Sequence, residues 1–275
     1  MKHAAVTTIL AFLLGGCFGG ASRDGGYYMD DGPHARPETN PHSVEKIVPR
    51  HEPLSRGGNK PYTVFGKHYV PMKSAKGYHE RGVASWYGKK FHGKRTSNGE
   101  TYNMYALSAA HKTLPLPSYV HVTNLDNGRS LIVRVNDRGP FLHNRLIDLS
   151  YSAASQLGIV GTGTGVVEVR AVDIDNYRNE APPTLAQQAR PAKTVSSGNR
   201  IYLQTGAFSD SGNAYRLESR LKSANLGKVF VVGSTSSGRT LYRVRIGPLA
   251  DINALDRLTE KVKELGIHDS HIVVD

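Results

Sequence analysis

The stretch YVHVTNLDNGRSLIVRV, residues 119–135, contains two runs in which apolar and polar side chains alternate. Alternation with a period of two is the pattern of a strand with one buried face, so the stretch predicts strands at 119–123 and 131–135. Between them, Asp126-Asn127-Gly128 is a strong hairpin signal, because Asn and Gly accept the left-handed backbone conformation of a tight turn. The stretch therefore predicts an antiparallel hairpin within a mostly-β domain.

The flanking sequence extends this domain over residues 79–173. Val166–Val172 is predicted as its last strand. A short helix is expected at Tyr151–Leu157, with Ser150 as its N-cap and Gly158 as its terminator. A serine hydroxyl accepts from the free N–H groups at a helix start, and glycine takes the left-handed conformation at a helix end. Short strands with one short helix are typical of a small barrel.

Residues 200–275 show a clear alternation of strand and helix patterns. Two segments have apolar residues spaced three and four apart, which predicts amphipathic helices, and Asp251 and Gly266 are the expected cap and end of the second. The predicted order is βαββαβ, with both helices on one face of a four-stranded sheet and the other face open. The apolar helix positions are Ala214, Leu217, Leu221 and Ala224, then Leu255, Leu258, Val262 and Leu265, and the strands are Ile201–Thr205, Val229–Val232, Leu241–Ile246 and Ile272–Val274.

The N-terminus has the pattern of a bacterial export signal. Lys2 begins a short basic region, and the apolar run Ala4–Leu14 is shorter than the about 20 residues that a membrane-spanning helix needs. The order Leu14-Gly15-Gly16-Cys17 resembles the lipobox, in which the cysteine becomes the lipidated first residue. The alternative is an ordinary signal peptide with an incidental cysteine. In such lipoproteins an aspartate after the cysteine favours the inner membrane; because Phe18 follows it here, the predicted location is the periplasmic face of the outer membrane.

Composition divides the rest of the chain into segments. Gly, Pro, His and Arg without periodicity predict a disordered tether, and clustered prolines predict a linker. The predicted segments are 1–16 as signal peptide, 17–60 as tether, 61–78 as a lead-in with a strand at Tyr62–Val70, and 174–199 as linker.

The chain carries a formal net charge of +12. Basic proteins bind polyanions such as nucleic acid or anionic lipid. Export excludes nucleic acid as a partner. The single cysteine excludes an intramolecular disulfide, so the exported domains must be stabilised by packing alone.

Five motifs in order closely resemble the rare lipoprotein A family. They are GVASWYG at Gly82–Gly88, TSNGE at Thr96–Glu100, AAHKTLP at Ala109–Pro115, NDRGP at Asn136–Pro140 and IDLS at Ile147–Ser150. The resemblance covers the whole first domain. It implies a six-stranded double-psi β-barrel and lytic transglycosylase activity on peptidoglycan glycan strands that lack stem peptides.

By the same resemblance, the expected catalytic residues are Asp137, Glu100 and His111. Cleavage of a glycosidic bond needs a proton donor at the leaving oxygen and a negative charge near the oxocarbenium-like carbon. Asp137 is the first choice as donor and later as base, Glu100 is expected to orient substrate or stabilise charge, and His111 to polarise one of them. Each also has an ordinary structural explanation: a turn-capping aspartate, a solvated glutamate and a packed histidine.

Three further residues of this domain are predicted to contact the glycan. Trp86 and Tyr87 could stack on sugar rings, and Arg138 follows Asp137 in the same motif. The only tryptophan of a small barrel is also often part of the core.

The C-terminal domain resembles the sporulation-related repeat (SPOR) family. The resemblance rests on IYLQTGAF at Ile201–Phe208 and LYRVRIGP at Leu241–Pro248, and it implies binding of glycan strands without stem peptides. Strand alternation places Tyr202 and Gln204 on the open face of the sheet, together with Arg243 and Arg245, while Tyr242, Val244 and Ile246 point inward. A strand without stem peptides exposes lactyl carboxylates, which arginine recognises well. The predicted glycan contacts are Tyr202, Gln204, Phe208, Arg243 and Arg245.

Two other signals are set aside. Gly161–Gly165 resembles a phosphate loop, but a strand-like segment follows where a helix is required, so a turn is predicted. Twelve histidines show no ligand spacing with a third ligand nearby, so neither metal nor cofactor is predicted.

These observations predict a lipid-anchored cell-wall enzyme. It would cut glycan endolytically and leave 1,6-anhydromuramyl ends, with division-site proteins as candidate partners at the septum. Two alternatives remain open: an expansin-like barrel that binds glycan without cutting it, and a hydrolase that uses an activated water.

Overall fold

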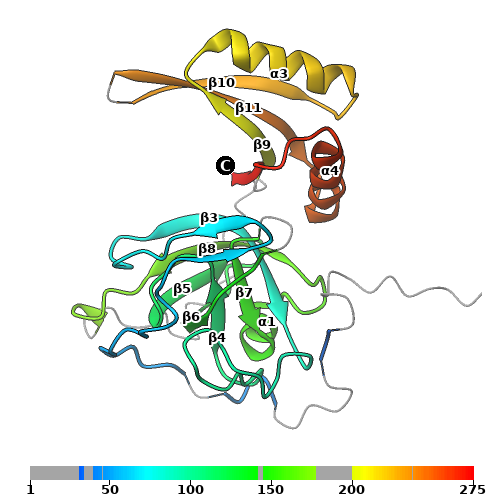
Figure 1. The fold of residues 1–275 in the computed structure, drawn as a ribbon. Helices are drawn as coiled ribbons and strands as arrows, with labels where there is room; N and C mark the ends of the chain where they lie inside the picture. Colours follow the sequence, from blue (N-terminus) through cyan, green and yellow to red (C-terminus); the bar gives the residue numbers. More distant parts are fainter. Residues whose placement is uncertain (1–30, 34–39, 45, 142–144, 178–199, 237) are drawn as a thin grey trace, which may run out of the picture.

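The computed structural model describes residues 31–33, 40–44, 46–141, 145–177, 200–236 and 238–275. The predicted signal peptide, Cys17 and most of the predicted linker lie outside these residues. The described chain forms a closed six-stranded barrel followed by an α/β domain (Figure 1), which confirms the predicted fold class. Among the described helices, none is long and apolar enough to span a membrane.

The barrel closes in the strand order β3-β7-β4-β6-β5-β8. β3 pairs with β7, and β4 with β6, in parallel, while the other four pairings are antiparallel. The strands are β3 (His79–Tyr87), β4 (Ser108–His111), β5 (Ser118–Asn124), β6 (Ser130–Asp137), β7 (Ile147–Ser150) and β8 (Gly165–Ala171). Non-polar side chains of all six strands belong to one buried cluster.

The predicted hairpin and helix are both confirmed. β5 and β6 pair antiparallel, and Gly128 in the turn has a φ of 72°. Helix α1 (Tyr151–Leu157) begins after Ser150, whose side chain accepts from the backbone N–H of Ala153, and Gly158 ends it with a φ of 75°. Gly161–Gly165 forms turns that lead into β8, as predicted.

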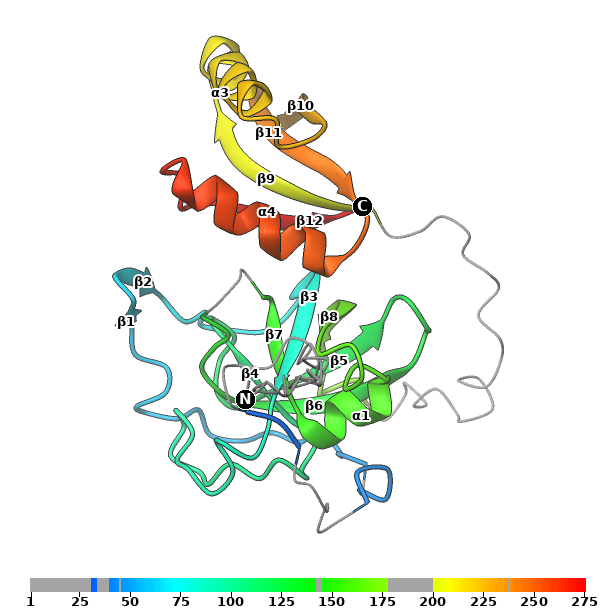
Figure 2. The same ribbon diagram turned by 90° about the vertical axis from the view of Figure 1, so that its right-hand side faces the viewer.

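The C-terminal domain has the predicted βαββαβ order. Its sheet has the strand order β10-β11-β9-β12, and helices α3 and α4 contact one face of it (Figure 2). The elements are β9 (Ile201–Phe208), α3 (Ser211–Ser223), β10 (Val229–Ser236), β11 (Arg239–Leu249), α4 (Ile252–Glu264) and β12 (His271–Val274). The predicted cap of α4 is confirmed, because the Asp251 carboxylate accepts from the N–H of Ala254.

The two domains pack against each other. β3 and β8 are the barrel strands nearest to the α/β domain (Figure 1), and β3 contacts β12. Val83 of β3 and Val166 of β8 belong to the same buried apolar cluster as Ile201 and the α4 side chains. The guanidinium of Arg145 is buried and lies 2.5 Å from the carboxylate of Asp256 in α4. An apolar contact and an ion pair therefore join the domains.

The segment before the barrel corrects the predicted boundary of the tether. Glu52 forms two hydrogen bonds to Arg134 of β6, and the side chain of Asn59 bonds to the backbone of Leu116. These contacts hold part of 46–60 on the barrel, although its composition predicted disorder up to residue 60. The predicted lead-in strand is a small hairpin of β1 (Tyr62–Val64) and β2 (Lys67–Tyr69).

Candidate active site

Asp137 ends β6 and accepts three hydrogen bonds on one carboxylate oxygen. The donors to its Oδ1 are the backbone N–H of Ser97 at 2.8 Å, the Ser97 hydroxyl at 2.6 Å and the backbone N–H of Arg138 at 2.7 Å. Among the described residues, Oδ2 has no hydrogen-bond partner, and the carboxyl remains partly accessible to solvent. The carboxyl is thus fixed through one oxygen while the other can meet a ligand.

Glu100 is held beside the same strand. Arg134 donates to its two carboxylate oxygens at 2.7 and 2.8 Å, and the Asn136 amide donates at 2.9 Å. The hydrogen bonds from Arg134 lower the pKa of Glu100 to about 2, and that from Asn136 adds to the effect. Its low pKa favours the ionised form of Glu100 at neutral pH, which suits charge stabilisation better than proton donation.

A single turn brings the two acidic residues to one end of β6. The backbone N–H of Thr96 donates to the carbonyl of Glu100, and Gly99 has a φ of 95°, a conformation that favours glycine. This turn carries Ser97 onto Asp137 and Glu100 onto Arg134. The same turn therefore supplies a hydrogen-bond donor to Asp137 and the carboxylate that binds Arg134, and the pairing of Asp137 and Glu100 in one catalytic site stays a prediction.

His111 does not have the environment that its predicted role requires. Its Nδ1 accepts from the backbone N–H groups of Thr113 and Leu114, so the ring proton lies on Nε2, which is 2.9 Å from the hydroxyl of Tyr78. Burial lowers the pKa of His111 to about 3, which keeps the ring neutral. Within the described residues its side chain bonds to neither Asp137 nor Glu100. The ring orders the end of β4 and contacts neither carboxylate directly, and its catalytic role stays a prediction.

Arg138 is also a structural residue rather than a free sugar contact. Its guanidinium donates to the backbone carbonyls of Gly58, His111 and Leu114, at 2.6 to 3.0 Å. With its donors directed at backbone carbonyls, it fixes the turn after Asp137.

The predicted stacking residues are part of the core. The Trp86 side chain is 5% exposed and packs near Tyr151, while Tyr87 is 7% exposed and stacks on Tyr102 with ring centroids 4.0 Å apart. A sugar ring has no access to their faces. The core alternative is the correct one for both residues.

Asp148 is a site residue whose role was not predicted, although it lies within the IDLS motif. It is half-buried on β7, and its Oδ1 accepts a hydrogen bond from the Ser85 hydroxyl. Burial raises the pKa of Asp148 to about 6, and the nearby Asp137 adds to the rise.

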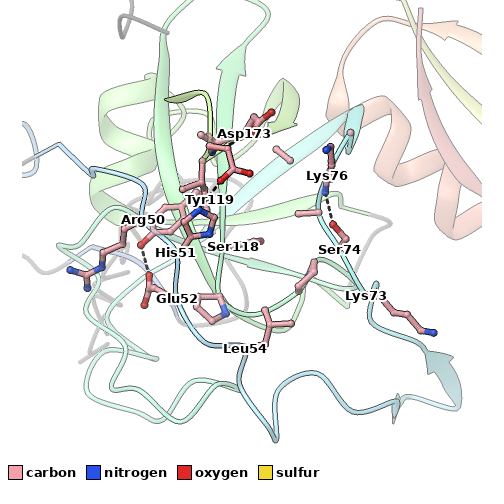
Figure 3. Close-up of a pocket in the computed structure, with 18 residues that line it drawn as sticks. Arg50, His51, Glu52, Leu54, Lys73, Ser74, Lys76, Ser118, Tyr119 and Asp173 are labelled. Atoms are coloured by element: carbon pink, nitrogen blue, oxygen red, sulfur yellow. Dashed lines mark hydrogen bonds and ion pairs between the residues drawn. The ribbon is translucent and has the colours of Figure 1, made fainter. Parts of the chain in front are cut away.

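The described residues also form a pocket of about 650 Å³ (Figure 3). Arg50, Lys73 and Tyr119 are among its lining residues, and Asp137 and Glu100 are not. Glu52 lines the pocket and also binds Arg134, which binds Glu100. The carboxyls that line it are those of Glu52, Asp173 and Asp175. No group of three or more His, Cys, Asp or Glu in the described part of the chain is arranged to hold a metal.

The open face of the C-terminal sheet carries most of the predicted glycan contacts. Gln204 lies opposite Arg245, and Arg243 opposite Ala207, on the face away from the helices. Tyr202 is on this face as well but is 7% exposed, because the Phe230 ring and the Arg245 guanidinium lie against it.

Phe208 is not on the open face. A register irregularity between Val244 and Arg245 reverses the alternation beyond Gln204, and Phe208 packs against the apolar cluster beneath the helices. The prediction for Phe208 as a glycan contact is therefore wrong.

Comparison with known proteins finds a matching family model for each domain. The family model described as lytic transglycolase matches residues 79–171, and the SPOR domain model matches residues 197–274. The chain is 41% identical to the endolytic peptidoglycan transglycosylase RlpA of Vibrio cholerae over 275 residues, covering 99% of this chain and 97% of that protein. It is 39% identical to the protein of the same name from Pseudomonas aeruginosa strain UCBPP-PA14, covering 78% of this chain and 77% of that protein.

A solved structure gives a weaker match. The crystal structure of the RlpA SPOR domain from Pseudomonas aeruginosa aligns with 26% of this chain and 96% of that chain, at 26% identity and a TM-score of 0.26.

Proposed function

This chain belongs to the RlpA family of endolytic peptidoglycan transglycosylases, and on that premise we propose that its barrel cuts glycan strands with Asp137 and Glu100 as catalytic residues. The chain is a lytic transglycosylase of the cell wall. The observation that carries the site is the turn at 96–100, which holds an ionised glutamate and a half-accessible aspartate at one end of β6.

The two carboxyls suit the two needs of the reaction. Protonated Asp137 gives its proton to the glycosidic oxygen, the bond from that oxygen to the muramyl anomeric carbon breaks, and the ionised Glu100 stabilises the positive charge that develops. The muramyl 6-hydroxyl then attacks the anomeric carbon and returns its proton to Asp137. The product has a 1,6-anhydromuramyl end, and no water is consumed.

Analysis of the products distinguishes this reaction from hydrolysis and from binding without cleavage. The full chain is incubated with glycan strands freed of stem peptides, and the fragments are separated and weighed. We expect anhydromuramyl ends. Fragments heavier by one water, with reducing ends, would mean a hydrolase, and intact strands would mean that the barrel only binds glycan.

We further propose that the open face of the SPOR domain binds the same strands through lactyl carboxylates. Arg243 and Arg245 project from β11 on this face, where Arg245 is paired with Asp275 at 3.1 Å and Gln204 is 8% exposed, so Arg243 is the first choice for a carboxylate contact. The domain keeps the barrel on its substrate.

Arg243→Ala is expected to weaken binding of peptide-free glycan about tenfold or more, because it removes a charge-assisted hydrogen bond. Binding is measured by fluorescence anisotropy with labelled strands at two salt concentrations. The matched control is Arg216→Ala, which removes an exposed arginine from α3 on the helix side. An equal loss in both variants would mean that only net charge matters.

Anchoring by a lipid on Cys17, at the outer membrane and near the division site, is the remaining part of the proposal. It is supported by the lipobox-like sequence that ends in the chain's single cysteine. We expect cells to incorporate labelled palmitate into the protein and not into Cys17→Ser. Labelling of the serine variant would contradict the assignment.

A further inference from the structure

Residues 55–60, here called the strap, come before β3 in the chain and lie on the barrel beside the turn that follows Asp137. The backbone N–H of Ser55 donates to the carbonyl of Leu116 at 2.8 Å. The side chain of Asn59 donates to the same carbonyl at 2.7 Å and accepts from the N–H of Leu116 at 2.8 Å. These hydrogen bonds to one barrel residue hold the strap in place.

The carbonyl of Gly58 joins the strap to Arg138. It accepts from Nε and Nη2 of the guanidinium, at 3.0 and 2.8 Å, while Nη1 donates to the carbonyls of His111 and Leu114. Because a buried donor without an acceptor is unfavourable, this carbonyl helps to fix the partly buried Arg138. The backbone N–H of Arg138 in turn donates to Oδ1 of Asp137 at 2.7 Å.

Gly58 also lies against the turn that carries Ser97. Gly58 is buried, and a Cβ at residue 58 would lie 3.0 Å from the carbonyl oxygen of Ser97 and 3.1 Å from Cδ1 of Leu116. Both distances are shorter than ordinary van der Waals contact. The backbone N–H and the hydroxyl of Ser97 are two of the three donors to Oδ1 of Asp137. The strap is therefore packed directly against a residue that holds this carboxylate.

The neighbouring glycine has no such contact. A Cβ at residue 57 would meet no atom within 4 Å. Neither Gly57 nor Gly58 has a φ in the left-handed region, so the backbone accepts alanine at both positions. The two adjacent glycines can therefore separate a general effect of alanine from an effect of contact with Ser97.

We propose that Gly58 is a positioning residue for the cleavage reaction, which holds Ser97 and thereby the carboxylate of Asp137 in place. It touches no reacting atom and acts through Ser97 on one side and through Arg138 on the other. The proposal rests on the proposed function, in which Asp137 is the proton donor. A strap that only stabilised the fold would change the melting temperature and leave the donors to Asp137 where they are.

Gly58→Ala should lower kcat on peptide-free glycan about tenfold and leave KM within about twofold of the wild type. The added methyl group must displace Ser97 or Leu116 by a few tenths of an ångström. A misplacement of about 1 Å at a catalytic group can cost about a hundredfold in rate. KM should be retained because the SPOR face is unchanged. Gly57→Ala adds the same methyl group in open space and should cut like the wild type.

Amide proton shifts separate positioning from stability, because they respond to the geometry of each N–H donor. The shifts of Ser97 and Arg138 are measured in the full chain together with cleavage rates and Tm. We expect both shifts to move in Gly58→Ala and neither to move in Gly57→Ala. Equal kcat in the two variants would overturn the proposal. A loss of kcat in Gly58→Ala with both shifts unchanged would overturn it as well.

Asn59→Ala decides the question if Gly58→Ala does not fold. It removes the side chain that binds the strap to Leu116 and adds no atom beside Ser97. The loosened strap should lower kcat a few-fold and move the amide shift of Arg138, and a wild-type kcat would overturn the proposal. A wild type that forms no product, while Gly58→Ala still moves both shifts, would refute the proposed function alone.

Discussion

Asp137→Asn should lower the rate of glycan cleavage about a thousandfold or more, because the variant keeps the shape of the donor and loses its proton. The asparagine Oδ1 can still accept from Ser97 and from the backbone N–H of Arg138, so the turn should survive. An amide cannot protonate the leaving oxygen, and general acid catalysis typically contributes a factor of about 10² to 10⁴. Initial rates on peptide-free glycan measure the effect.

Binding must survive in this variant for the result to be informative. Affinity for the glycan should match the wild type, since the SPOR face is untouched, and Asp126→Asn on the exposed hairpin should cut normally. Cleavage by Asp137→Asn at more than about a tenth of the wild-type rate would show that the proton comes from another group.

Glu100→Gln should lower kcat about a hundredfold, because it removes the negative charge that stabilises the developing cation. Glutamine has the same size and can still accept one hydrogen bond from Arg134. Since the pKa of Glu100 is about 2, its charge persists across the working pH range and is lost only in strong acid, together with its contribution to stability. The rate of the variant should therefore stay low at every pH where the fold is intact.

Glu52→Gln provides the matched comparison for Glu100. It removes the other carboxylate from Arg134 with little change of shape, yet Glu52 lines the pocket of Figure 3, which Glu100 does not. We expect a loss of a few-fold at most. If Glu52→Gln lost as much activity as Glu100→Gln, Glu100 would act by positioning Arg134 and not by contacting the substrate.

Local patterns explain which parts of the fold could be predicted from the sequence. The β5–β6 hairpin, α1 and the elements of the βαββαβ domain could be predicted because their periodicity, turns and caps are visible in the chain. β4 has the sequence SAAH, which is short, has no alternation and is buried along its whole length. β4 and β7 were missed as strands because non-local pairings, and not propensity, define them.

The candidate site likewise has features that the sequence predicts and features that it does not. The motifs predicted that Asp137 and Glu100 form one site, and the turn at 96–100 carries both Glu100 and Ser97, which donates to Asp137. Side-chain direction is not encoded in a motif: the Nδ1 of His111 is bound by backbone N–H groups, and a register irregularity turns Phe208 toward the helices. Asp148 was overlooked because a single aspartate on a short strand gives no sign of its neighbours across the barrel.

The packed contact between the barrel and the α/β domain affects how the enzyme binds the cell wall. Arg145 is buried and pairs with Asp256 of α4, and Val83 and Val166 of the barrel pack into the apolar cluster of the α/β domain. Separating the domains would expose this apolar surface to water, which is unfavourable. The sheet therefore has a defined position relative to the barrel, and a glycan strand bound on the sheet would reach the barrel at a set distance.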